Sequence, residues 1–156
     1  MIYQFIDKIY LEVIIMIIMS IDLGDARTGL AICDKMEILA VPIGIIKETQ
    51  LDEIIKKISQ KAIYYNVDQI IVGYPKNTNG SIGERAKKTQ RFSQKLSKEL
   101  NGIQVILWDE RNTTISAAGI LNEVNVRGKK RKNIIDEVAA VIILESYLNY
   151  RKNTQL

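Results

Sequence analysis

The feature that most constrains this chain is an apolar run that ends in one aspartate and a glycine-containing bend. Residues 14–21 are almost all β-branched or apolar, Asp22 follows directly, and Gly24 and Gly29 come soon after. Such a run is typical of a buried strand, and glycines are typical of a tight turn after it. A carboxylate that leaves a buried strand is costly unless it is paired or bound to a cation. The run therefore predicts a first core strand that presents Asp22 to a partner.

Matching acids stand far downstream. Asp109 and Glu110 directly follow the apolar segment 105–108, and ligands of parallel sheets gather beyond the carboxyl ends of strands. Asp136 is expected to open the last helix. Carboxylates that hold Mg²⁺ or Mn²⁺ can activate water and stabilise the leaving oxygen in phosphodiester hydrolysis. The acids together with Asp22 therefore suggest a divalent-metal site.

Each acid also has a purely structural interpretation. Asp22 would suit a simple hairpin turn, and Asp109 with Glu110 would suit an acidic helix start. Asp136 would be favoured in a first helical turn by the helix dipole alone. Because adjacent strand residues point to opposite faces, the sequence leaves open whether Asp109 or Glu110 faces the site. The three positions taken together favour a metal site over these separate explanations.

Composition narrows the chemistry. The 156 residues are 47% hydrophobic, which fits one globular domain, and the net charge of +4 with a pI near 9.1 is compatible with a nucleic-acid partner. The chain has no histidine, which excludes Ser-His and Cys-His catalysis and most zinc sites. Its one cysteine, Cys33, is predicted to be a core residue, so we expect a reducing cytoplasm. The apolar run 13–19 is too short to span a bilayer, and no membrane association is expected.

The remaining pattern predicts an α/β domain with a five-stranded mixed sheet flanked by helices. Short polar links join the first three strands as an antiparallel meander, and the later strands continue in parallel. We expect residues 1–15 to be an extension with a misassigned start, since Met16 and Met19 are alternative starts, and residues 16–151 to form the single domain. The expected strands are 14–22, 29–34, 39–46, 69–73 and 105–108, and the expected helices are 51–65, one that ends at 101–102, 112–123 and 134–150.

A dense basic segment precedes Asp136. Arg127 to Lys132 holds five cations in six residues, and on a loop this density suits contacts with a phosphate backbone. A solvated surface loop would have the same composition. The segment 74–81 is rich in turn formers and could equally contact substrate or only connect two elements. The candidate nucleic-acid contacts are Arg27, Lys76, Asn77, Arg111, Arg127, Lys129, Lys130, Arg131 and Lys132.

Four motifs in order resemble the YqgF/RuvX family over residues 16–150. They are Ile21-Asp22-Leu23-Gly24, Val72-Gly73-Tyr74-Pro75, Trp108-Asp109-Glu110-Arg111 and Ile135-Asp136-Glu137-Val138. The resemblance implies a ribonuclease H-like fold and a bacterial cytoplasmic nuclease that matures the 5′ end of precursor 16S rRNA. It also implies that Asp22, Glu110 and Asp136 form the metal-binding catalytic set. Two departures are a longer N-terminal segment and Tyr74, which stands where a leucine is common.

The leading hypothesis is therefore an endonuclease that uses Mg²⁺ or Mn²⁺ on structured RNA in ribosome biogenesis. One alternative is a Holliday junction resolvase that acts on branched DNA, because the family is also described as resolvase-like. Another is a non-catalytic RNA-binding factor of ribosome assembly. An actin-like ATPase is disfavoured, since such folds close two domains around a nucleotide and 156 residues supply one. The expected partners are precursor rRNA, branched DNA or ribosome-assembly intermediates, and the sequence leaves a monomer or a homodimer open.

Overall fold

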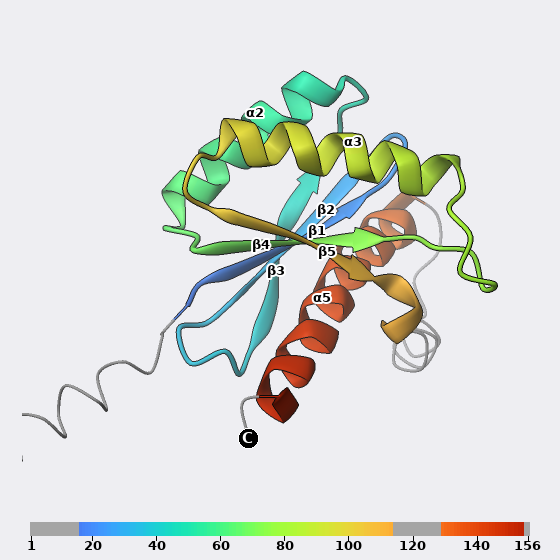
Figure 1. The fold of residues 1–156 in the computed structure, drawn as a ribbon. Helices are drawn as coiled ribbons and strands as arrows, with labels where there is room; N and C mark the ends of the chain where they lie inside the picture. Colours follow the sequence, from blue (N-terminus) through green and yellow to red (C-terminus); the bar gives the residue numbers. More distant parts are fainter. Residues whose placement is uncertain (1–15, 114–128, 155–156) are drawn as a thin grey trace, which may run out of the picture.

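The computed structural model describes residues 16–113 and 129–154, and within these ranges it describes the side chains of all residues except 112–113 and 129–133. Figure 1 shows a central sheet with helices on both faces. The elements in chain order are β1 (Ile18–Leu23), β2 (Thr28–Cys33), β3 (Ala40–Ile46), α2 (Leu51–Tyr64), β4 (Gln69–Tyr74), α3 (Glu84–Glu99), β5 (Gln104–Asp109), the 3₁₀ turn η1 (Glu110–Thr113) and α5 (Lys129–Thr154).

The sheet confirms the predicted mixed topology. Its strand order is β3-β2-β1-β4-β5, with β1–β2 and β2–β3 antiparallel and β1–β4 and β4–β5 parallel. Short turns connect the first three strands, whereas α3 provides the crossover between β4 and β5. The carboxyl ends of β1, β4 and β5 consequently meet at one edge of the sheet, where a site is expected in such folds.

Two hydrophobic cores lie on the two faces of the sheet. On β1, Met19 and Ile21 point to the face covered by α2 and α3, whereas Ile18 and Ser20 point to the face covered by α5. This alternation follows from the period of two along a strand. The same period places Asp22 on the α5 side. Each buried isoleucine or leucine stabilises the fold by roughly 1.5–3 kcal/mol.

Helix α5 lies unusually close to the sheet because the facing residues are small. The hydroxyl of Ser20 donates a hydrogen bond to the carbonyl oxygen of Ala140 at 2.6 Å, and both residues are fully buried. Gly29 on β2 lies so close to the backbone carbonyl of Asp136 that a side chain there would overlap it. Ser20 and Gly29 thus set the distance at which α5 carries Asp136 past the strand ends.

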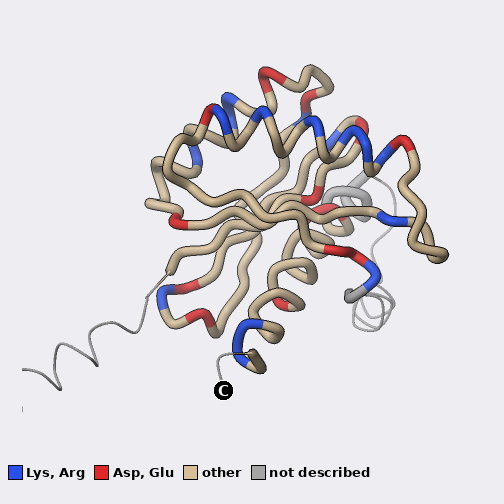
Figure 2. Tube along the Cα trace, in the orientation of Figure 1, with Lys and Arg blue, Asp and Glu red and all other residues tan. Residues whose placement is uncertain are grey.

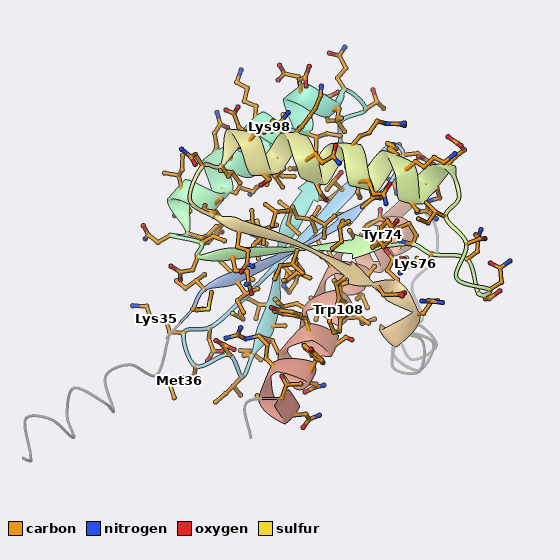
Figure 3. The ribbon with its side chains drawn as sticks, in the orientation of Figure 1. Lys35, Met36, Tyr74, Lys76, Lys98 and Trp108 are labelled. Carbon is orange, nitrogen blue, oxygen red and sulfur yellow. The ribbon has the colours of Figure 1, made fainter. Side chains whose placement is uncertain are left out.

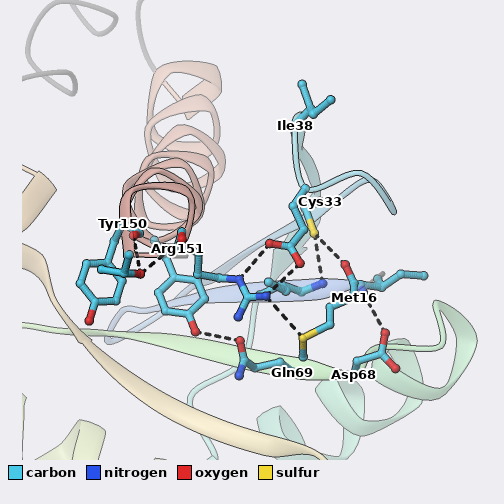
Figure 4. Close-up of polar contacts among 12 residues, drawn as sticks. Met16, Cys33, Ile38, Asp68, Gln69, Tyr150 and Arg151 are labelled. Carbon is cyan, nitrogen blue, oxygen red and sulfur yellow. Dashed lines mark hydrogen bonds and ion pairs between the residues drawn. The ribbon is translucent and has the colours of Figure 1, made fainter. Parts of the chain in front are cut away.

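The far end of α5 is tied down by polar contacts (Figure 4). The Arg151 guanidinium donates two hydrogen bonds to the Glu37 carboxylate, at 2.8 and 3.0 Å, and this raises the pKa of Arg151. The Tyr147 hydroxyl donates to Gln69 Oε1 at 2.9 Å. The Cys33 thiol is buried, as predicted, and it accepts a hydrogen bond from the backbone N–H of Ile18 at 3.2 Å. Of these contacts, those of Arg151 and Tyr147 hold α5 against the sheet and the β2–β3 turn.

One expectation about the later elements was wrong. Helix α5 begins at Lys129 instead of residue 134, so Lys129–Lys132 are helical and Asp136 lies beyond the first turn. Repulsion between neighbouring cations, and their unfavourable position at the start of a helix, cost only tenths of a kcal/mol, which the high helix propensity of Lys and Arg outweighs. A 3₁₀ turn occupies residues 110–113 and overlaps only the first two residues of the helix expected over 112–123.

Other predictions fall on residues 1–15 and 114–128, which lie outside the described part of the chain; these are the N-terminal extension, most of the predicted helix 112–123, and Arg127. Within the described part, no helix is both long enough and apolar enough to cross a membrane.

Candidate active site

The site is organised by a row of residues that crosses the sheet on the α5 side. Asp22 on β1 is paired with Gly29 on β2, and Gly73 on β4 is paired with Trp108 on β5. Because Ile21 lies opposite Val72 in the parallel pair, the next residues along, Asp22 and Gly73, are also neighbours. A glycine therefore flanks Asp22 on each side. The two missing side chains leave room for groups from elsewhere in the chain.

Glu110 fills the space above Gly73. A Cβ atom at residue 73 would lie 2.7 Å from Glu110 Oε1 and 2.6 Å from Ile143 Cδ1. The carboxylate is therefore folded back over the sheet beside Asp22, although Glu110 belongs to the turn that follows β5. Only glycine at residue 73 permits this position of the carboxylate.

Asp136 comes from the other side of Asp22, on helix α5. Its backbone lies against Gly29, and its carboxylate accepts a hydrogen bond from the Arg27 guanidinium at 3.4 Å. Arg27 is held by a tight turn in which the Gly24 N–H donates to the Arg27 carbonyl at 2.9 Å. A cavity of about 420 Å³ lies between this turn and the α5 segment that contains Asp136.

The three acids influence one another electrostatically. Burial raises the pKa of Asp22 to about 6, and the negative charges of Glu110 and Asp136 add to the rise. Burial also raises the pKa of Glu110. In both cases the positive charge of Arg85, in the first turn of α3, acts in the opposite direction. A carboxylate pushed above its ordinary pKa by burial and by like charges gains most from a bound cation.

Asp109 has a different role from its neighbour Glu110. Its carboxylate accepts hydrogen bonds from the Arg111 guanidinium, the shortest 2.6 Å, and lies 3.8 Å from the Lys76 ammonium. The Arg111 bonds lower the pKa of Asp109, and Lys76 lowers it further. Figure 3 shows Lys76 just beyond Tyr74, at the end of β4, and Trp108 beside α5. Asp109 thus belongs to an ion-pair cluster, whereas Glu110 faces Asp22.

The acid set fits a hard divalent cation in its chemistry. It offers carboxylate oxygens, the ligands that Mg²⁺ and Mn²⁺ prefer, and the mutual repulsion of its charges would be relieved by an ion. The carboxylates of the acid set do not, however, lie in a coordinating arrangement. Among the described residues no three acidic, histidine or cysteine side chains converge closely enough to hold an ion, and the Asp136 carboxylate is turned to Arg27. Binding would therefore require side-chain movement, chiefly of Asp136.

The predicted nucleic-acid contacts divide into two groups. Arg27 forms an ion pair with Asp136 of the acid set, whereas Lys76 and Arg111 form ion pairs with the neighbouring Asp109. Asn77 instead stabilises its own loop, because its side-chain amide donates to the Ser81 hydroxyl at 2.8 Å. Arg127 lies outside the described residues, and Lys129, Lys130, Arg131 and Lys132 have only their backbone described, in the first turn of α5.

The sequence interpretation missed Arg85 and the packing role of two glycines that it had named. Gly29 and Gly73 matter because of their register, which is set only when strands pair. Composition does not distinguish Arg85 from the other cations of residues 84–99. One feature of the sequence does point to Arg85. A helix that follows a parallel strand begins at the edge of the sheet where that strand ends, so a cation in its first turn is as good a candidate for the site as a residue that directly follows the strand.

Solved structures resemble this fold. A Thermus thermophilus RuvC structure superposes with a TM-score of 0.58 at 12% identity, covering 89% of this chain and 98% of that one. The yeast mitochondrial Holliday junction resolvase Ydc2 gives a TM-score of 0.53 at 11% identity, covering 97% of this chain and 89% of that one. At such low identity these likenesses show the fold alone, and that fold is the predicted ribonuclease H-like one.

Sequence relatives are much closer. A protein of Halothermothrix orenii is 46% identical over 134 residues, which cover 86% of this chain and 95% of the relative. One of Agathobacter rectalis is 37% identical over 141 residues, which cover 88% of this chain and 98% of the relative. Both carry the name "Putative pre-16S rRNA nuclease". Residues 16–150 match the family RuvX, described as Holliday junction resolvase, and the chain therefore belongs to the RuvX family.

Proposed function

We propose that this protein is a divalent-metal-dependent endonuclease that cleaves precursor 16S rRNA near its 5′ end. The names of its relatives support the substrate. The observation that carries the chemistry is the packing of Glu110 over Gly73 beside the half-buried Asp22, with Asp136 brought to the other side by α5. Three acids from distant parts of the sequence share one end of the sheet without any histidine to serve as a base.

In this proposal Asp22, Glu110 and Asp136 would hold the ion, and a bound Mg²⁺ or Mn²⁺ would activate water and stabilise the leaving oxygen. Asp22 would be the central ligand because it lies between the other two acids and burial raises its pKa to about 6. Arg27 and Lys76 flank the acids on two sides, where they can hold phosphates of the bound strand. The ion pair between Lys76 and Asp109 keeps that cation at the mouth of the site.

Branched DNA is the second candidate substrate, favoured by the resolvase description of the family. The two substrates can be compared directly. Purified protein with Mn²⁺ or Mg²⁺ is offered a precursor 16S rRNA fragment and a four-way DNA junction under the same conditions. Specific cleavage of the RNA alone supports the proposal. Cleavage of the junction alone would make branched DNA the substrate and leave the assignment of the catalytic residues unchanged.

The site itself is tested with the variants D22N and D136N. Each should lower cleavage by about 100-fold or more while the protein still binds the substrate, because transition-state charge stabilisation is lost. The matched control is D52N, which removes an exposed carboxylate on α2 that pairs with Lys95 at 3.0 Å. Wild-type protein that binds RNA without Mg²⁺ and cleaves neither substrate would instead indicate a non-catalytic assembly factor.

A further inference from the structure

Arg85 differs from the other cations near the acid set. Arg27 pairs with Asp136, Lys76 and Arg111 lie against Asp109, and Lys88 Nζ is 3.1 Å from Asp25 Oδ1. Arg85 is exposed, and among the described residues its guanidinium is in no hydrogen bond or ion pair, although its charge acts on both Asp22 and Glu110. Its guanidinium donors are consequently available to a ligand.

The position of Arg85 is fixed by the packing of α3. Ala86 and Thr89 are buried, so the first turns of the helix cannot roll. One turn further on, the side chain of Gln90 donates a hydrogen bond to the Tyr74 hydroxyl at 2.6 Å, which ties α3 to the end of β4. Lys88, three residues after Arg85, bonds Asp25 in the turn that follows Asp22. An exposed arginine is thus held by a rigid helix beside the site.

The charge balance at the site also favours an anion at Arg85. The positive charge of Arg85 lowers the pKa of Asp22 and of Glu110, and a bound divalent ion would neutralise these acids and leave Arg85 free to attract an anion. An arginine fork matches the geometry of a phosphate and can donate two parallel hydrogen bonds. Figure 2 shows that α3 carries several further basic positions along its length, away from the acids. Arg85 is the basic residue of this helix that acts electrostatically on both acids.

We propose that Arg85 binds the phosphodiester group that is to be cut and orients it against Asp22 and Glu110. This inference rests on the proposed nuclease function, and it assigns the residue that holds the scissile phosphate. Arg85 lies in the α3 layer, on the opposite side of the sheet from the α5 layer that carries Asp136. The nucleic-acid strand would therefore be held between the two helices at the edge of the sheet. The contact requires both the charge and the forked donors of arginine.

The test compares R85Q and R85K with R91Q. Arg91 is exposed on the same helix, and its replacement removes the same charge away from the acids. Cleavage kinetics are measured with Mn²⁺ on the better of the two substrates. The Kd of a fluorescein-labelled RNA stem with a single-stranded 5′ extension is measured in EDTA at several salt concentrations, and thermal melts verify that each variant is folded.

We expect R85Q to weaken binding about tenfold and to lower kcat as well, because the phosphate is both held and oriented by Arg85. The slope of log Kd against log salt should fall by about 0.7–0.9, the value for one lost phosphate contact. R85K should recover part of the binding but less of kcat, and R91Q should stay within about twofold of wild type. Equal behaviour of R85Q and R91Q would overturn the inference.

The two proposals fail in different ways. Absence of any cleavage by the wild-type protein contradicts the nuclease function, while the Kd comparison still decides whether Arg85 binds phosphate. Cleavage by the wild-type protein together with unchanged kcat, KM and Kd in R85Q removes Arg85 from the site and leaves the nuclease function intact.

Discussion

The Glu110 carboxylate occupies the place that a side chain on Gly73 would take: Glu110 Oε1 is 2.7 Å from where a Cβ would stand. The pairing of β4 with β1 puts Gly73 next to Asp22, so this one missing side chain allows two acids from distant parts of the sequence to meet. The relationship is local, and it can be broken without altering either acid.

The variant G73A should therefore separate the effect on the site from the effect on the fold. The new Cβ would be 2.6 Å from Ile143 Cδ1 as well as against Glu110, so we expect a loss of stability of about 1–3 kcal/mol and loss of cleavage. The double variant G73A/I143V removes the Ile143 atom but leaves the clash with Glu110. It should regain stability in urea unfolding without regaining cleavage. Recovery of both properties would show that the position of Glu110 is not important.

The raised pKa of Asp22 predicts an unusual pH dependence of stability. Its pKa is about 6 in the folded protein against 3.8 as the ordinary value, so between these values the folded state binds the extra proton. Without metal, the free energy of unfolding should fall as pH rises through this window, because the unfolded state has already lost the proton that the folded state still binds. Above the folded-state pKa both states have lost the proton, so the free energy of unfolding should level off. D22N lacks the charge, so at pH 8 its free energy of unfolding should exceed that of the wild-type protein by on the order of 3 kcal/mol. Near pH 4 the two free energies of unfolding should differ little. Urea unfolding in EDTA at the two pH values measures this difference, and a pH-independent difference would contradict it.

Binding of a divalent ion should offset the loss of stability that the charged Asp22 carboxylate causes. At a concentration 100 times its Kd, Mn²⁺ would stabilise the folded protein by about 2.7 kcal/mol, which corresponds to a rise in Tm of roughly 5–10 °C for a domain of this size. The rise should be small in D22N and should shrink at pH 5, where Asp22 is largely protonated. D52N is the control and should respond as wild type does. A Tm shift that survives in D22N would place the ion elsewhere.

The succession of strands along the chain and their antiparallel-then-parallel arrangement could be predicted from local patterns, because apolar periodicity identifies the elements and the length of a link limits how neighbouring strands pair. The sequence identified Asp22 as a strand-end acid for the same reason. It could not show that Gly29 and Gly73 flank Asp22, since register arises only from pairing between distant segments. The start of α5 was misplaced because a basic cluster has the composition of a loop, while its helix propensity and the packing of the following residues decide the outcome.

The choice between Asp109 and Glu110 lay beyond sequence reasoning for a physical reason: adjacent residues at a strand end point opposite ways, and their partners decide the roles. In the structure Asp109 accepts hydrogen bonds from Arg111, whereas Glu110 lies half-buried over Gly73, beside Asp22. This arrangement predicts that E110Q abolishes cleavage and the Mn²⁺-induced rise in Tm, with the fold intact.

D109N is the matched partner of E110Q, because it removes one negative charge from the neighbouring residue. It should keep the Mn²⁺ response and lose only a few-fold in activity, by loosening the Arg111 and Lys76 side chains that Asp109 holds. Single-turnover cleavage and thermal melts on both variants decide the matter. If D109N lost the metal response and E110Q kept it, the roles of the two acids would have to be exchanged.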